Sequence, residues 1–164
     1  MKPAPPVTRI FTGVNVIEVE VVKVVRTSMA PAFVRRVLDR AAEVPEIAAR
    51  VPEGSSTLAV RITGDEEMAA LNRRYAGEPH ATDVLSFSGS RGHLGDIAIS
   101  WPAVVRQAEQ YGHDDATEAA LLSVHGLLHL LGWDHATAAE RKEMTRLTVL
   151  ALSRSRIKLT PKRL

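Results

Sequence analysis

The segment DATEAALLSVHGLLHLLGWDH, residues 115–135, carries the most apolar run of the chain and ends in a glycine turn. Asp115 and Glu118 stand three apart, in the spacing of a capping box that begins a helix. Gly132 can adopt the left-handed conformation that ends one. We therefore predict an apolar helix from about Ala116 to Leu131, followed by a reversal of the chain.

Two histidines of this helix, His125 and His129, lie four residues apart. At 3.6 residues per turn their imidazoles share one face of the helix, about 40° apart, close enough to bind one cation. After Gly132 the chain can bring back His135 as a third nitrogen donor. Three protein ligands and one open position are typical of catalytic zinc, which lowers the pKa of its bound water toward neutrality. The sequence therefore predicts one Zn²⁺ per chain, bound by these three histidines.

The same spacing also describes a class of zinc peptidases, which place a glutamate directly after the first histidine as general base. Here Gly126 occupies that position and cannot transfer a proton. A peptidase is therefore a disfavoured alternative. The remaining histidines, His80, His93 and His113, have no metal-binding spacing, and we predict that they are surface residues.

Outward from this segment, the chain alternates between strand and helix patterns. Ile17, Val19 and Val21 alternate with glutamates within 14–25, which indicates an edge strand with one solvated face. We predict further strands over 56–63, 83–88 and 96–100, and helices from Ser28 to Pro45, from 65 to Gly77, from Ser100 to Gly112, and from Thr137, with Glu140 in capping-box spacing, to about Leu152. These elements predict an α+β fold, a small mixed β-sheet packed with several helices, with the metal site on a helix and the following turn.

Length and composition limit the class of protein. A chain of 164 residues with 45% hydrophobic and 24% charged residues suits one soluble domain, so zinc would serve chemistry rather than folding. The absence of cysteine excludes disulfides, thiolate metal sites and a cysteine nucleophile, and it suits a reducing, cytoplasmic location. We expect no membrane-spanning segment, because the longest apolar run falls short of the roughly 20 residues that a bilayer requires.

The chain divides into three parts. We predict a disordered, proline-containing leader over 1–13, a single zinc hydrolase-like domain over 14–153 and a basic tail over 154–164, which holds five basic and no acidic residues. The tail is open to two interpretations, a phosphate-seeking arm for RNA or the ribosome, and a solvated terminus. Aromatic residues make up only 4%, so RNA contacts would depend on charge and shape, and we assign Tyr75 and Trp133 to the core.

Three blocks, ATDVLSFS at 81–88, LGDIAIS at 94–100 and HGLLHLLGWDH at 125–135, together resemble the YbeY family of endoribonucleases. The resemblance extends from about Leu58 to Leu150, with the LNRRY and QAEQYG segments and Glu118 in their usual places. It implies a single-domain α+β fold, a zinc held by the three histidines and cleavage of single-stranded RNA. It also implies action on ribosomal RNA, with the ribosome or ribosomal proteins as partner.

The resemblance also suggests substrate contacts. The family usually has an arginine followed by glycine after LNRRY, where this chain has Ala76 and Gly77, and Arg73 or Arg74, about one turn earlier, would have to supply the phosphate contact. Thr82, Asp83 and Ser86 would line the cleft beside zinc, although Asp83 also suits a strand cap and Ser86 a packing position.

Asp134 has two interpretations. It suits a carboxylate that orients a ligand imidazole or accepts a proton from water, and it equally suits a turn residue after the helix. Asp96 and Asn72 are assigned to turn and loop hydrogen bonds.

Two functions remain open at this stage. The first is a zinc endoribonuclease in which zinc-bound hydroxide attacks the phosphodiester or activates the neighbouring 2′-hydroxyl. The second is a metal-stabilised ribosome-assembly or quality-control factor that binds RNA without cutting it, which Ala76 and the basic tail favour.

Overall fold

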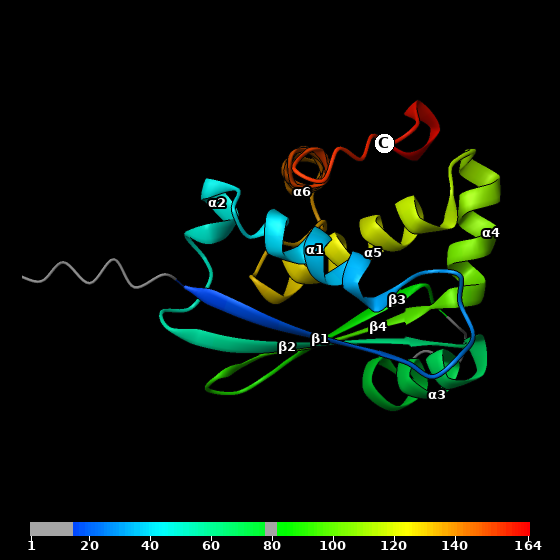
Figure 1. The fold of residues 1–164 in the computed structure, drawn as a ribbon, viewed down its shortest axis with the longest axis horizontal. Coiled ribbons are helices and arrows are strands. Elements are labelled where there is room, and N and C mark those ends of the chain that lie inside the picture. The colour runs from blue at the N-terminus through cyan, green and yellow to red at the C-terminus, as the bar shows by residue number, and fades with distance from the viewer. Residues whose placement is uncertain (1–14, 78–81) are drawn as a thin grey trace, which may run out of the picture.

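The structure, a computed structural model, describes residues 15–77 and 82–164 (Figure 1). The predicted leader and His80 lie outside the described residues. The strands are β1 (Val16–Lys23), β2 (Ser55–Thr63), β3 (Val84–Ser88) and β4 (His93–Ser100). The helices are α1 (Pro31–Ala41), α2 (Pro45–Ala48), α3 (Asp65–Ala76), α4 (Trp101–Tyr111), α5 (Asp115–Leu130), α6 (Ala138–Ser153) and the short 3-10 helix η1 (Pro161–Arg163).

The strands form one mixed sheet in the order β1-β2-β4-β3. β1, β2 and β4 are parallel, whereas β3 pairs antiparallel with β4 and forms the opposite edge. Val60 of β2 lies beside Ile97 of β4, which in turn pairs with Ser86 of β3. The mixed sheet and the edge position of β1 confirm the sequence prediction, and the glutamates of β1 are exposed as expected.

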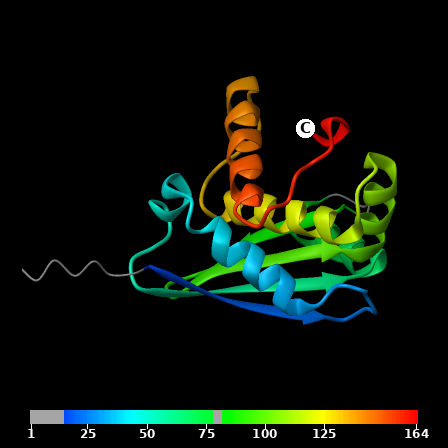
Figure 2. The same cartoon turned by 45° about the horizontal axis from the view of Figure 1, so that its top comes forward.

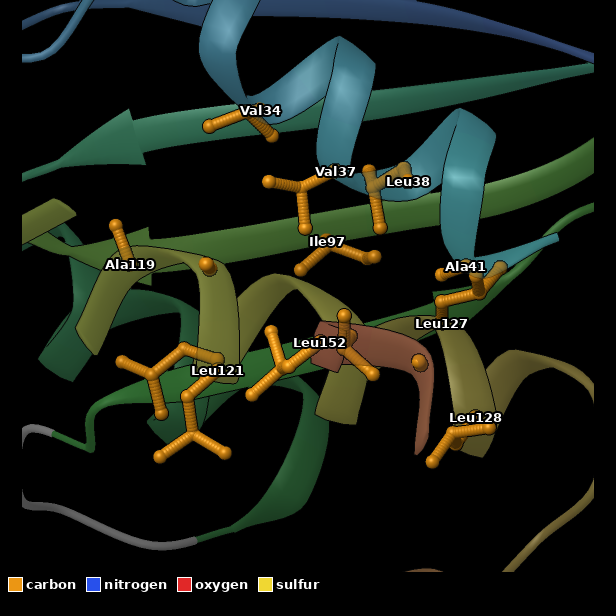
Figure 3. Packing of buried hydrophobic residues seen from close by; sticks show 14 of the residues in the cluster. Val34, Val37, Leu38, Ala41, Ile97, Ala119, Leu121, Leu127, Leu128 and Leu152 are labelled. Atoms are coloured by element: carbon orange, nitrogen blue, oxygen red, sulfur yellow. The ribbon is translucent and has the colours of Figure 1, made fainter. Parts of the chain in front are cut away.

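The helices cover the two faces of the sheet unequally. α1, α5 and α6 lie on one side and α3 lies on the other (Figure 1). The main core fills the space between α5, α1 and the sheet, where Leu38, Ile97 and Leu127 are completely buried (Figure 3). Burying each such side chain contributes roughly 1.5–3 kcal/mol, so α5 is held mainly by its apolar contacts.

Gly126 brings α5 close to the sheet. A Cβ at this position would lie 2.8 Å from Cγ2 of Ile97 on β4. From the neighbouring edge strand, Ser86 donates its hydroxyl hydrogen to the Gly126 carbonyl oxygen at 3.2 Å. The absence of a side chain therefore lets the helix that carries the histidines settle directly on β4 and β3.

Several helix ends differ from the sequence prediction. α5 is capped by Asp114, whose carboxylate accepts a hydrogen bond from the Thr117 amide at 2.7 Å. The predicted capping box of Asp115 and Glu118 is wrong, because the buried Glu118 carboxylate contacts the side chains of His113 and Arg163 instead. The capping box of Thr137 and Glu140 is confirmed.

The first helix also begins and ends elsewhere than predicted. Ala30, not Ser28, stands at its N-cap, and the helix ends at Ala41. Pro45 begins the short helix α2 rather than ending the first helix, because its fixed φ suits a first helical position.

The segment after α6 folds back over α5 toward α4 (Figure 2). Leu159 is buried, and the Thr160 hydroxyl donates to the Tyr111 carbonyl oxygen at 2.7 Å. Arg163 donates to the Glu118 carboxylate at 2.8 Å. The interpretation of this segment as a solvated terminus is therefore wrong, because Leu159 is buried and Arg163 binds the buried Glu118 carboxylate.

Two further single-residue predictions are wrong. The His113 side chain is 6% exposed and lies 2.5 Å from the Glu118 carboxylate, so it is a buried residue and not a surface one. Tyr75 is 59% exposed, so it does not belong to the core. Its ring meets the edge of Phe87 on β3, with 5.0 Å between ring centroids.

Candidate metal centre

His125 and His129 project from successive turns of α5, and His135 returns from the segment that follows. The Nε2 atoms of His125 and His129 are 3.0 Å apart. The His135 ring centroid lies 5.4 Å from that of His125 and 4.9 Å from that of His129. One ring nitrogen from each residue lies within 4.8 Å of the other two, and no other group of metal-binding side chains was found in the part of the chain that the structure describes.

The turn after α5 directs His135 back toward the helix. Gly132 has a φ of 95°, a left-handed value that a side chain would strain, as its position in the sequence predicted. The amides of Gly132 and Trp133 donate to the carbonyl oxygens of His129 and Leu128, both at 3.0 Å. These bonds close the last turn of the helix and fix where the third imidazole returns.

The surroundings of His125 and His129 favour the neutral form of these two imidazoles. Burial, followed by the nearby His129 and His135 rings, lowers the pKa of His125 to about 4. Burial and then His135 also lower the pKa of His129 below its usual value. A neutral imidazole carries the lone pair that binds a metal ion, so at pH 7 these two rings are prepared as ligands.

The three residues fit a divalent metal ion such as zinc. Nitrogen ligands at 2.0–2.1 Å from a tetrahedral ion lie about 3.3 Å apart. The separations found here, from 3.0 Å to at most 4.8 Å, reach that value with small rotations of the imidazole rings. The donor set is also the one that imidazole-binding transition metals prefer.

The imidazoles open onto a hollow of about 470 Å³ between α5 and the edge strand β3. It is lined by Thr82, Asp83, Val84, Leu85, Ser86, Ser88, His125, His129, Leu130 and His135. A second cavity of about 320 Å³ shares Asp83, Val84, His125 and His135 with it and extends toward α6. A ligand can therefore reach the histidines from two sides.

The predicted contacts Thr82 and Asp83, just before β3, and Ser86, on β3, line the same hollow as the histidines, and the structure gives them internal hydrogen bonds. The Asp83 carboxylate accepts from the Val84 amide at 2.8 Å and from the Gln107 side chain at 3.2 Å. Thr82 donates to the same carboxylate at 3.5 Å. Together with the bond from Ser86 to α5, these contacts fix the edge strand against the metal-binding helix.

Other predicted site residues lie farther from the imidazoles or have a different contact. The Asp134 carboxylate accepts from the His135 amide at 2.7 Å, the hydrogen bond of a turn residue. Arg73 and Arg74 are exposed on α3, across the sheet from α5. The Arg74 guanidinium lies 5.3 Å from the centre of the Tyr75 ring.

Sequence reasoning missed Arg141 and Arg163, which line the second cavity, and Gln107, which contacts Arg163 behind it. Arg141, in the first turn of α6, donates from Nη1 to the carbonyl oxygens of His135 and Ala136 at 3.3 and 3.2 Å. Its place soon after His135, behind a capping box, was the available signal. Arg163 and Gln107, which are 3.4 Å apart, meet only through the tertiary fold, so no local pattern indicates them.

A membrane-crossing element is not found: in the described ranges 15–77 and 82–164, every helix is too short or too polar to span a bilayer.

Comparison with known proteins identifies the family. Residues 17–156 match the family described as Endoribonuclease YbeY. The chain is 42% identical to Endoribonuclease YbeY of Chloroflexus aurantiacus, covering 71% of this chain and 87% of the relative. It is 38% identical to Endoribonuclease YbeY of Halalkalibacterium halodurans, covering 72% and 81%. The solution structure of TM1509 from Thermotoga maritima has the same fold, with a TM-score of 0.57 at 18% identity over 86% of this chain and 92% of that one. The chain therefore belongs to the YbeY family of endoribonucleases.

Proposed function

We propose that this chain is a zinc-dependent endoribonuclease that cleaves single-stranded RNA in ribosomal RNA maturation and ribosome quality control, in the cytoplasm, with the ribosome or ribosomal proteins as its partner. The observation that carries the proposal is the convergence of three imidazole nitrogens within 4.8 Å at the floor of an open hollow. Membership in a family of endoribonucleases supports RNA as the substrate.

Different residues of the chain would bind the metal ion, contact the RNA and transfer a proton. His125, His129 and His135 would hold the ion, which when bound would supply Lewis-acid stabilisation of the phosphodiester and lower the pKa of water. β3 and the two residues before it would form the wall along which the strand of RNA lies, and Thr82, Asp83 and Ser86 would line that wall. Asp134, next to His135 in the chain, would orient that imidazole or accept a proton from water.

Position 126 supports hydrolysis of RNA over hydrolysis of peptides. A peptidase of this spacing needs a glutamate there as general base. In this chain the residue faces Ile97 on the sheet, and a Cβ would already lie 2.8 Å from that side chain. A glutamate has no room at this position, so the peptidase alternative lacks both the residue and the space for it.

The test combines metal analysis with RNA cleavage. Purified protein, His129→Ala and the matched control His93→Gln are assayed for zinc content and for cleavage of single-stranded and duplex RNA, with and without chelator. We expect one zinc per chain and chelator-sensitive cleavage of single strands for the wild type and the control. The Ala variant should lose both while remaining folded. Cleavage that survives the loss of zinc would refute zinc dependence, and RNA binding without cleavage by zinc-loaded wild type would favour the assembly-factor alternative.

A further inference from the structure

The second cavity lies directly beside the metal ligands, between α5, α6 and the segment 159–164. His125 and His135 form its boundary with the metal centre. Its lining is mainly apolar, with Leu121 and Leu122 from α5 and Met144 from α6, and it also includes polar side chains such as Thr145 and Thr148. At about 320 Å³ it falls at the lower end of the size range of small-molecule sites.

The outer wall of this cavity is held in place by a chain of polar contacts. The Arg163 guanidinium binds Glu118, which is completely buried, and lies 3.4 Å from the Gln107 side-chain oxygen. Gln107 in turn donates to Asp83 at the boundary with the metal hollow. The cavity is therefore part of a fixed arrangement that links the segment after α6 to the metal centre.

Arg141 supplies a positive charge at the cavity's edge. Within the described residues its hydrogen bonds run only from Nη1, to the carbonyl oxygens of His135 and Ala136. These bonds hold the guanidinium against the metal-binding turn and leave Nε and Nη2 for another acceptor. A guanidinium offered in this way suits a phosphate oxygen, to which it can donate two parallel hydrogen bonds.

We propose that this cavity receives one nucleotide of the RNA, next to the phosphodiester at the metal centre. The base enters between the leucines and Met144, and Arg141 binds the phosphate of that nucleotide. The inference rests on the proposed function and adds a nucleotide site to it. A mainly apolar lining, an adjoining guanidinium and the adjoining candidate metal centre together match the base, the phosphate and the scissile bond of one nucleotide.

The site gives a physical reason for a preference for single strands. Protein pockets take up bases that are splayed out of a strand, whereas a base in a duplex is stacked and paired and must first be extruded. A paired strand lying on β3 cannot place a base in the cavity without losing that pairing. The cavity would thus select against duplex RNA because it admits only an unpaired base, and not through base-specific contacts.

The first experiment measures binding of adenosine 5′-monophosphate to the zinc-loaded full chain by calorimetry. Thr145 lines the cavity from the exposed side of α6, so Thr145→Trp is expected to fill it and weaken binding at least about tenfold. Val149→Trp is the matched control, because Val149 is exposed on the same helix and does not line the cavity. Adenosine and inorganic phosphate, measured separately, are each expected to bind more weakly than the nucleotide.

The second experiment tests the phosphate contact through RNA cleavage. Arg141→Gln is expected to raise KM about tenfold with kcat changed less than twofold, since the contact exists before and during the reaction. It should also reduce the slope of log affinity for single-stranded RNA against log salt by about 0.7, the value for one phosphate contact. Lys142→Gln makes the same change of charge on the neighbouring exposed residue, outside the cavity lining, and should leave both quantities unchanged.

The outcomes separate the two proposals. Equal nucleotide binding by wild type and Thr145→Trp overturns the nucleotide site, whether or not the protein cleaves RNA. Loss of nucleotide binding in Thr145→Trp, with nucleotide binding retained by Val149→Trp, supports it, even if wild type cleaves no RNA and the proposed function fails. Arg141→Gln changes a surface residue and keeps the test decisive if the tryptophan variant does not fold. If Thr145→Trp binds nucleotide as the wild type does but no longer binds a protein partner, the cavity belongs to that partner and the inference is overturned.

Discussion

Gly126 lies one residue after His125, on the side of α5 that faces the sheet. It has two consequences, because it brings the metal-binding helix onto β4 and leaves no room for the general base of a peptidase. At the residue scale, the packing of the helix and the chemistry of the site therefore depend on the same missing side chain.

Gly126→Ala is expected to lower the free energy of unfolding by about 1 kcal/mol. The new Cβ would lie 2.8 Å from Cγ2 and 3.0 Å from Cδ1 of Ile97. Overpacking of this kind costs about 1–3 kcal/mol, and the better helix propensity of alanine offsets up to about 1 kcal/mol of it. Urea denaturation measures the change. In an Ile97→Ala background the substitution should be neutral or stabilising, and an equal loss in both backgrounds would show that Ile97 is not the cause.

Asp114→Ala is expected to reduce stability by about 1 kcal/mol at pH 7, because it removes the N-cap of α5. Hydrogen bonds from Thr117 lower the pKa of the Asp114 carboxyl below its usual value. A lowered folded-state pKa means that the charged cap stabilises the protein above the unfolded pKa of 3.8 and that this contribution is lost as pH falls through the folded pKa.

Urea denaturation at a series of pH values tests whether the stabilisation by Asp114 decreases on acidification, as the lowered pKa of its carboxyl requires. The difference between wild type and Asp114→Ala should be constant near neutrality and shrink below about pH 4. Asp114→Asn, whose side-chain oxygen caps without titrating, serves as the control and should show little pH dependence relative to Asp114→Ala. A difference that grows on acidification would contradict the assignment.

At the scale of elements, α5 joins the core, the metal ligands and the segment after α6. Its buried face packs on the sheet, its C-terminal half carries two histidines, and its first turn carries Glu118. Glu118 accepts from His113 and Arg163, so one buried acid ties η1 and the turn before α5 together.

Glu118→Ala is expected to destabilise the protein by about 3 kcal/mol, because it leaves the Arg163 guanidinium without its buried partner. The segment after α6 should also loosen, so trypsin is expected to cut after Arg154, Arg156 or Lys158 faster than in wild type. Denaturation and timed proteolysis measure the two effects. Glu118→Gln retains the size of the side chain and part of its hydrogen bonding. Its stability and its proteolysis rate should therefore lie between those of the wild type and those of Glu118→Ala. An unchanged proteolysis rate in the Ala variant would mean that Leu159 and Thr160 suffice to hold the segment.

The elements were predictable where a local pattern determines them. The alternation in β1, the Thr137 capping box and the left-handed glycine after α5 are properties of neighbouring residues, and each is found in the structure. The spacing of His125, His129 and His135 is equally local, and their nitrogens do converge.

What the sequence did not predict depends on residues far apart in the chain. Glu118 has the spacing of a capping residue, but Arg163, 45 positions later, and His113 engage it instead. Tyr75 is an aromatic residue of a kind usually found in a core, yet its position on α3 exposes it to solvent, where its ring contacts Phe87 on the edge strand β3. The cavity beside the metal centre requires α6 and the segment after it to return over α5, which no short pattern encodes.

At the scale of the whole molecule, the apolar core and the candidate metal centre lie in separate places. The core between α1, α5 and the sheet consists of fully buried aliphatic side chains, whereas two of the histidines are half-buried and the third is exposed. We therefore expect the fold to form without the ion, and a bound ion would stabilise it further by mass action.

Removal of metal by a chelator is expected to leave the far-ultraviolet circular dichroism at 25 °C unchanged. Zinc at about one hundred times its Kd should add about 2.7 kcal/mol of stability, which corresponds to a rise in Tm of roughly 5–10 °C for a domain of this size. Scanning calorimetry with and without chelator measures the shift, and His129→Ala should abolish it. Unfolding on chelation at 25 °C would show that the ion is part of the fold.

The position of residues 159–164 on the cavity wall also bears on the order in which the protein matures. All three histidines precede α6, so during translation the ribosome delivers them before it delivers the wall. If the two proposed sites function as we infer, a nascent chain would be able to bind a metal ion before it could bind a nucleotide. A product terminated short of residue 159 would retain the metal ligands with an incomplete neighbouring cavity, and truncation would uncouple metallation from substrate capture.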